Sequence, residues 1–161
     1  MKKSKVVLFG LGYVGYSISL LLSKSASVYA IDIDSTKVQK IKKNIPLFKD
    51  KFISDYLKNN DTNINASTNL ENVMHDADFF IICTPTDLIK DSNNFDLSSI
   101  YSICDQLAKL SIAGTVVIKS TVPIGFTDLL NKKYSNLNIL FSPEFLREGN
   151  SLHDNLYPSR I

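Results

Sequence analysis

The sequence of 161 residues predicts one α/β domain built on an open, doubly wound sheet of parallel strands. Three observations support this fold class. Short apolar runs without polar alternation, such as 6–9, are typical of strands that a parallel sheet buries on both faces. These runs alternate with segments whose apolar residues recur at helical spacing. A glycine-rich segment separates the first apolar run from the first helical segment.

The local pattern of residues predicts the position of each element. The polar segment 84–97 is expected to be a loop, and His75 and His153 are expected to be surface residues. Helix N-caps are expected at Asp34 or Ser35 and at Asp96 or Ser98. Strands are predicted at 6–9, 27–31, near Ile64, 79–83, 115–119 and 139–141. Helices are predicted at 13–23, from about 35, around 52–57, behind the cap near 97 and over Phe126, Leu129 and Leu130.

The composition excludes several classes of protein. The chain has 18 Lys and Arg against 16 Asp and Glu, and a net charge of +2 gives no support for a nucleic-acid partner. Its two cysteines lack metal-ligand spacing, so we expect no metal and a reducing, cytoplasmic location. The basic start and the uncharged stretch 6–22 resemble a secretory signal. That stretch is too long for one and is interrupted by three glycines, so neither a signal nor a membrane span is expected.

Gly10, Gly12 and Gly15 form a G-x-G-x-x-G segment together with Tyr13 and Val14. The segment follows a predicted strand and opens a predicted helix, which is the context of a Rossmann-like dinucleotide-binding loop. Gly10 allows the tight turn, Gly12 lets the backbone approach a pyrophosphate, and Gly15 lets helix and strand pack closely. The helix N-terminus faces the phosphate charge.

Asp32 stands at the end of the second predicted strand. Its carboxylate would accept hydrogen bonds from the ribose hydroxyls and repel a 2′-phosphate, so the expected cofactor is NAD rather than NADP. Lys37 lies about one helical turn further on, where it either reaches the ribose or phosphates or is solvated. The alternative for this whole pattern is a tight turn with a solvated Asp.

Three successive strand ends carry hydroxyl groups and proline. Ligands of doubly wound sheets bind at these ends, so we expect the hydroxyls to contact a ribose, a nicotinamide amide or a substrate. The alternative is that Ser, Thr and Pro are simply good turn residues. The residues concerned are Thr84, Pro85 and Thr86, then Ser120, Thr121 and Pro123, then Ser142, Pro143 and Glu144.

Segment 142–149 concentrates charge beyond the last predicted strand. It holds Glu144 and Glu148, which are two of the three glutamates, and Arg147. Paired carboxylates in different environments can divide acid and base chemistry. The alternative is a turn that starts a helix and carries a surface salt bridge. Cys83 closes a very apolar strand and Cys104 lies on an inner helix face, so both are expected to be structural.

Several motifs together resemble the UDP-glucose/GDP-mannose dehydrogenase family. They are GLGYVG, the acid in AIDID, CTPT, KSTVPIGFT and SPEFLREGNSLHDNLYPSRI. The last of these is the most specific, and its DNLYPSRI end is similar to the UDP-glucose branch. GDP-mannose dehydrogenases share a similar PEFLRE stretch, and UDP-N-acetylmannosamine dehydrogenases differ at FLRE.

The resemblance implies that residues 1–161 are the NAD-binding domain, that 143–161 begin the sugar-nucleotide site, and that a C-terminal substrate domain is absent. Family enzymes oxidise the sugar's primary alcohol twice with NAD, through a thioester on a cysteine that lies beyond residue 161. The chain alone is therefore expected to be inactive, and the full-length enzyme a homodimer with UDP-glucose as its substrate. The chain also stops at Arg160 and Ile161, inside an expected further strand.

Roles for individual residues come from the same resemblance. Val14, Asp32, Lys37, Thr86, Thr121 and Glu148 match cofactor-contacting positions. Glu144, Phe145, Leu146, Arg147 and Glu148 match part of the sugar-nucleotide site. Thr121, Glu144 and Glu148 match positions that handle water and hydrolyse the thioester. A function of another class stays open, namely a stand-alone NAD-binding regulatory domain like those of potassium-transport regulators, although PEFLREG has no role in such a regulator.

Overall fold

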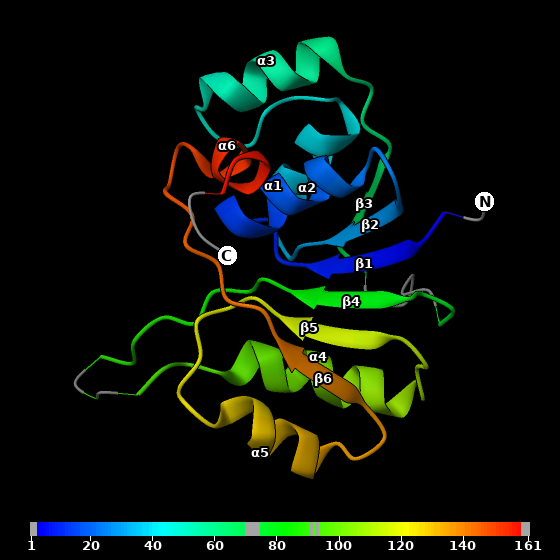
Figure 1. Cartoon of the computed structure of the whole chain (residues 1–161), viewed down its shortest axis with the longest axis vertical. Helices are drawn as coiled ribbons and strands as arrows, with labels where there is room; N and C mark the ends of the chain where they lie inside the picture. The colour runs from blue at the N-terminus through cyan, green and yellow to red at the C-terminus, as the bar shows by residue number, and fades with distance from the viewer. Residues whose placement is uncertain (1–2, 70–74, 91, 93, 159–161) are drawn as a thin grey trace.

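A six-stranded parallel sheet organises the computed structural model, which describes residues 3–69, 75–90, 92 and 94–158. The strand order is β3-β2-β1-β4-β5-β6, and each neighbouring pair is parallel (Figure 1). This confirms the predicted fold class. The strands are β1 (Lys5–Phe9), β2 (Ser27–Ile31), β3 (Ile64–Ser67), β4 (Phe79–Ile82), β5 (Thr115–Ile118) and β6 (Asn138–Phe141).

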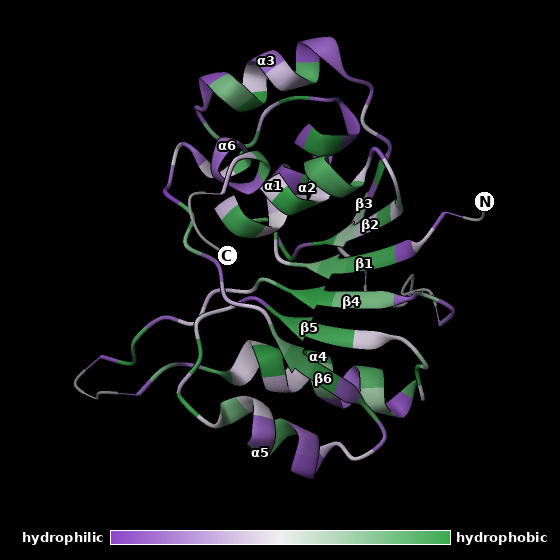
Figure 2. Ribbon diagram, in the orientation of Figure 1, coloured by the Kyte–Doolittle hydropathy of each residue, from purple (hydrophilic) through white to green (hydrophobic). Residues whose placement is uncertain are grey.

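Helices cover both faces of the sheet, as the continuous apolar strands require. In β1, Val7 and Phe9 join the core formed with α4 and α5, whereas Val6 and Leu8 join the core formed with α1, α3 and α6. Figure 2 shows hydrophobic residues along the central strands and on the helix faces turned to them. The helices are α1 (Tyr13–Leu22), α2 (Ser35–Lys42), α3 (Lys51–Asn59), α4 (Ser98–Lys109), α5 (Phe126–Lys133) and α6 (Ser151–Leu156).

The sheet reverses its winding between β1 and β4. β1 pairs with β2 on one side and with β4 on the other, and the helices that follow β1 and β4 pack on opposite faces. The carboxyl ends of these two strands therefore border a crevice. In doubly wound sheets this switch point is where ligands bind.

The two expected helix caps have different outcomes. Asp34 is the N-cap of α2, and its side chain accepts a hydrogen bond of 2.8 Å from the Thr36 N–H. For α4 the prediction of a cap at Asp96 or Ser98 is wrong, because Leu97 occupies the N-cap position without a side-chain bond. Asp96 instead accepts the Ser98 N–H at 2.9 Å from one residue further out.

The predicted loop 84–97 contains a narrow antiparallel arm that extends away from the sheet (Figure 1). Leu88 pairs with Phe95 in an isolated bridge, and the Ile89 N–H donates to the Asn94 carbonyl at 2.8 Å. The Asp96 N–H donates to the Asp87 carbonyl at 2.8 Å, which closes the base of the arm. The arm thus brings the residues after β4 back toward α4.

The last helix, α6, was expected only in the alternative interpretation of segment 142–149, as the helix that the turn starts. Its Leu152 is fully buried, and the Asn155 amide donates to the Ser17 hydroxyl of α1 at 2.9 Å. The His153 side chain is 42% exposed, in line with the expected surface position, and its ring also meets Phe52 edge-on at 5.3 Å. His75 is exposed as expected.

Two further expectations concern the chain ends and a membrane span. The strand expected to include 160 and 161 lies outside the described residues. Among the described helices, none combines the length and the apolar character that crossing a membrane requires.

Candidate functional site: a cleft at the carboxyl ends of the central strands

The three glycines of the loop after β1 have different structural roles. Gly10 has φ +91°, and a Cβ there would lie 2.7 Å from the Cys83 carbonyl oxygen. A Cβ on Gly15 would lie 1.9 Å from the Gly10 carbonyl oxygen, so α1 can approach β1 only with glycine there. Gly12 is the N-cap of α1, and a Cβ there would have no heavy atom within 4 Å. Only Gly12 therefore faces open space.

Asp32 connects this loop to the end of β2. Its Oδ2 accepts the Leu11 N–H at 2.6 Å and its Oδ1 accepts the Asp34 N–H at 2.8 Å. The Lys37 ammonium lies 3.3 Å from Oδ2, and the Asp32 side chain is 7% exposed. The structure therefore places Asp32 against the glycine loop, with Lys37 beside the acid. The carboxylate also holds the loop in place, a role that sequence reasoning missed.

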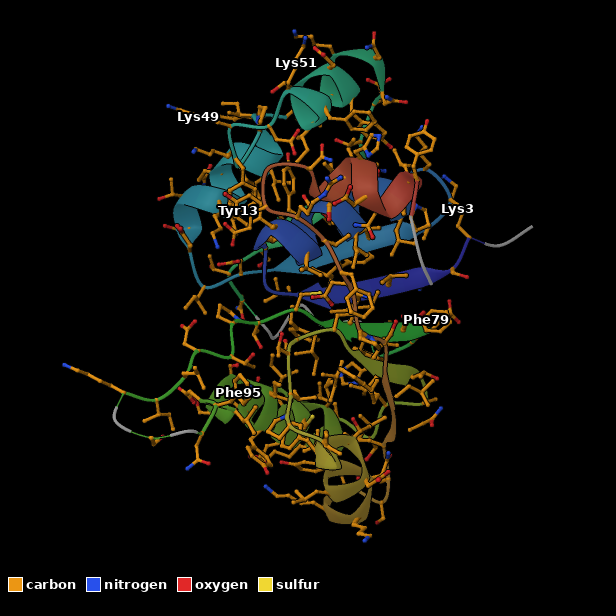
Figure 3. The ribbon with its side chains drawn as sticks, turned by 60° about the vertical axis from the view of Figure 1, so that its left-hand side comes forward. Lys3, Tyr13, Lys49, Lys51, Phe79 and Phe95 are labelled. Carbon is orange, nitrogen blue, oxygen red and sulfur yellow. The ribbon has the colours of Figure 1, made fainter. Side chains whose placement is uncertain are left out.

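A cleft of about 420 Å³ opens where the central strands end. In Figure 3, Tyr13 marks its α1 side and Phe95 its α4 side. Gly10, Gly15, Asp32, Lys37 and Phe145 are not part of its lining, although they belong to the predicted set. The predicted residues that do line it are Gly12, Tyr13, Val14, Thr84, Pro85, Thr86, Ser120, Thr121, Glu144, Leu146, Arg147 and Glu148.

The hydroxyl groups at the strand ends tie those ends together. The Ser120 hydroxyl donates to the Thr84 carbonyl and the Thr86 hydroxyl donates to the Thr121 carbonyl, each at 2.7 Å. The Ser99 hydroxyl of α4 donates to the Thr84 hydroxyl at 2.9 Å. A hydroxyl that donates its single proton in this way can offer a ligand only its lone pairs. The turn-residue and ligand-contact interpretations of these residues are thus compatible.

Lys119 is a lining residue that sequence reasoning missed. It follows β5, and its Nζ donates to the Ser142 carbonyl oxygen at 2.8 Å and lies 3.3 Å from the Ser142 hydroxyl. The signal for it was available, because a lysine directly precedes the hydroxyl pair that ends this strand. Lys119 brings a positive charge into the cleft.

Glu144 is half-buried and lines the same cleft as Lys119. Its Oε2 is buried and has no hydrogen-bond partner among the described residues. Burial raises the pKa of the Glu144 carboxyl, while the charge of Lys119 opposes that rise. A buried carboxylate oxygen without a partner is costly, and a ligand donor in the cleft would satisfy it.

Arg147 and Glu148 are exposed on the same segment and line the cleft. Asp154 of α6 binds the Arg147 guanidinium at two points, Nη2 to Oδ1 at 2.7 Å and Nε to Oδ2 at 3.0 Å. These bonds hold the pKa of Asp154 well below its usual range. The segment therefore is a turn that precedes a helix and carries a salt bridge, as the alternative interpretation expected, and it also lines the cleft.

Neither cysteine is placed to act as a nucleophile. Cys83 is 9% exposed at the end of β4, and Cys104 is fully buried on α4. Burial raises the pKa of each thiol to about 12. Both are therefore structural in the sense expected from the sequence.

We expect both thiols to resist iodoacetamide at pH 8 in the folded chain. With a pKa of about 12, the thiolate fraction at pH 8 is about a thousandfold smaller than for a free cysteine. Intact-mass measurement should show no added group before unfolding and two added groups in denaturant. Rapid native labelling that Cys83→Ser removes would contradict the structural assignment.

The glycine loop at a helix N-terminus, the acid after β2 and the cleft at the switch point define a dinucleotide-binding domain. The sequence model of the UDP-glucose/GDP-mannose dehydrogenase family, NAD binding domain, matches residues 4–161. The chain therefore belongs to this family and is its NAD-binding domain. That membership disfavours the alternative of a stand-alone regulatory domain.

Relatives and solved structures agree with this assignment. The chain is 42% identical over 159 residues to a UDP-glucose 6-dehydrogenase of Campylobacter jejuni and 41% identical over 157 residues to one of Streptococcus pneumoniae. Each match covers 98% of this chain and 40% of the relative. The fold matches a GDP-mannose dehydrogenase from Pseudomonas aeruginosa with TM-score 0.81 and 26% identity, over 95% of this chain and 39% of that one. The chain thus spans about two fifths of its relatives' length.

Proposed function

We propose that this chain is the NAD-binding part of a UDP-glucose 6-dehydrogenase, which oxidises UDP-glucose to UDP-glucuronate. One observation carries the proposal: Glu144 and Glu148 line the same cleft as Gly12 and Val14 of the dinucleotide loop. A simple nucleotide-binding module needs no carboxylates there. The identity of about 40% to two UDP-glucose 6-dehydrogenases supports UDP-glucose as the substrate.

The residues present fit NAD. Gly12 leaves open space at the N-terminus of α1, where the first N–H groups of the helix have no intrahelical acceptor. These groups would bind the pyrophosphate, with Tyr13 and Val14 beside it. The remaining lone pairs of Asp32, with Lys37 next to them, would bind the ribose hydroxyls. Bound NAD supplies the hydride acceptor.

The strand-end hydroxyls would act as hydrogen-bond acceptors toward the ligand. Ser120 and Thr86 already donate their protons to carbonyl groups, so their free lone pairs suit the N–H of a carboxamide or the O–H of a ribose. Their bonds also hold the ends of β4 and β5 in register. A rigid acceptor of this kind orients a ligand with little loss of side-chain freedom.

Glu144 would serve as the base that takes a proton from water. Its buried Oε2 has no partner among the described residues, and burial raises the pKa of the carboxyl, which makes the carboxylate a stronger base. Arg147 is paired with Asp154 through Nε and Nη2, so Nη1 is the part of its guanidinium outside that pair and would meet a polar group of the sugar nucleotide. Glu148 and Thr121 would complete the water-handling set.

The Asp32→Ser substitution tests cofactor choice. Loss of a charge-assisted bond to the ribose should cost about 1.5–3 kcal/mol, or roughly 10- to 100-fold in NAD affinity. Loss of the negative charge should also improve NADP binding relative to NAD. Calorimetric titration of both cofactors gives the ratio of the two dissociation constants, which does not depend on the fraction of folded protein.

Lys37→Met is the matched control for this substitution. It removes the positive charge 3.3 Å from Asp32 and leaves the acid, so the preference for NAD should persist or widen. An unchanged ratio of the NAD and NADP dissociation constants in Asp32→Ser would mean that the acid does not contact the ribose.

Titration with UDP-glucose and GDP-mannose tests the substrate assignment. Tighter binding of GDP-mannose than of UDP-glucose would contradict it.

A further inference from the structure

We propose that Lys119 is a positioning residue of this site: its ammonium group ties the end of β5 to Ser142, which limits where Glu144 can lie, and places a positive charge in the same cleft as the Glu144 carboxylate. The inference rests on the proposed function for its purpose, because Glu144 is the base of that proposal. The hydrogen bond from Lys119 to Ser142 and the effect of the Lys119 charge on Glu144 do not depend on which ligand binds.

The tether begins on a rigid base. The Lys119 N–H donates to the Ile82 carbonyl at 2.8 Å, and the Ser142 N–H donates to the Ile118 carbonyl at 2.9 Å. Lys119 therefore sits in the sheet between the ends of β4 and β6. Its stem needs only to span one strand spacing to reach the Ser142 carbonyl, where its Nζ donates at 2.8 Å.

The tether reaches Glu144 through a stiff connection. Ser142 is two residues before Glu144, and Pro143 stands between them. Proline fixes its own φ and restricts the residue before it to extended conformations. A hydrogen bond that fixes Ser142 therefore limits where the Glu144 backbone and side chain can lie.

The charge acts on a carboxylate whose buried Oε2 has no hydrogen-bond partner among the described residues. The other titratable or charged side chains that line the cleft come from α1, from the segments after β4 and β5, and from the segment of Glu144 itself: Tyr13, Cys83, Asp87, Lys119, Arg147 and Glu148. Of these, Lys119 is the one whose charge lowers the pKa of Glu144, against the larger effect of burial. Without Lys119, the positive charge that opposes the effect of burial would be lost, so the pKa of Glu144 would rise further.

Only three glutamates occur in the chain, which makes a direct test practical. The chain is labelled with ¹³C at the glutamate carboxyl carbon, and the Glu144 signal is assigned with Glu144→Gln. Its chemical shift is followed against pH in the unliganded wild type, Lys119→Met, Lys119→Gln and Lys119→Arg. We expect the Glu144 midpoint to rise in Lys119→Met and to stay near the wild-type value in Lys119→Arg.

Lys119→Gln separates the charge from the tether. The glutamine amide can still donate to the Ser142 carbonyl but carries no charge, so the Glu144 midpoint should also rise in this variant. Lys119→Gln replaces Lys119→Met in the test if the Met variant does not fold.

Amide hydrogen exchange at 145–148 reports the tether. The exchange should be severalfold faster in Lys119→Met and should return to the wild-type rate in Lys119→Arg. An unchanged Glu144 midpoint in a folded, uncharged variant would overturn the proposal. The titration uses no ligand, so absent NAD binding would refute the proposed function without touching this result.

Discussion

Gly12→Val is expected to abolish NAD binding while the chain stays folded. Gly12 has φ −76°, which any residue can adopt, and a Cβ there meets no heavy atom within 4 Å. The branched side chain would fill the space in which the pyrophosphate approaches the helix N-terminus. We expect affinity for NAD to fall at least about 100-fold, equivalent to about 2.7 kcal/mol. Isothermal titration calorimetry measures it.

Stability provides the control for this substitution. Valine is a poorer N-cap than glycine, which should cost the free energy of unfolding about 1 kcal/mol or less. A urea titration by circular dichroism checks that the folded fraction is unchanged under the binding conditions. A folded Gly12→Val chain that binds NAD as tightly as the wild type would show that the cofactor does not approach this loop.

Gly15→Ala is expected to have the opposite profile and to destabilise the fold. Its Cβ would lie 1.9 Å from the Gly10 carbonyl oxygen and 3.0 Å from Leu8 Cδ2. Because the first of these is backbone, α1 must move away from β1, and we expect a loss of about 3 kcal/mol or more in the free energy of unfolding. Alanine is otherwise favoured over glycine within a helix by about 1 kcal/mol, so the sign of the effect is diagnostic.

Gly12→Ala is the matched control for Gly15→Ala. It adds the same methyl group three residues earlier, at the N-cap of α1, where no heavy atom lies within 4 Å, so its urea midpoint should stay near that of the wild type. If the two alanine variants unfold at the same urea concentration, the close approach of α1 to β1 would not be the reason for glycine at position 15. The pair separates the glycine that gives access to a ligand from the glycine that serves packing.

Most elements of the sheet were predictable because their signals are local. The apolar run at 27–31 became β2 with the same bounds, since a strand buried on both faces needs no alternation to identify it. The glycine spacing and Asp32 were also predictable, because a dinucleotide-binding loop requires glycines at fixed spacing and an acid at the end of the next strand. The bounds of α6 were not predicted because its six residues carry little periodicity, and its burial comes from docking on α1 and α3.

The amino-acid sequence alone determined the fold class, the glycine loop and its acid, and the family, because these depend on residue types at short, fixed spacing. The tertiary structure decided what spacing cannot encode. It showed that both oxygens of Asp32 bind backbone N–H groups, that Ser120 and Thr86 donate across strand ends, and that Lys119 reaches Ser142. Except for the local bond between Asp32 and the Asp34 N–H, these bonds join segments that are far apart in the chain. Hydrogen-bond directions and burial depend on how those elements pack, and packing joins residues far apart in the chain.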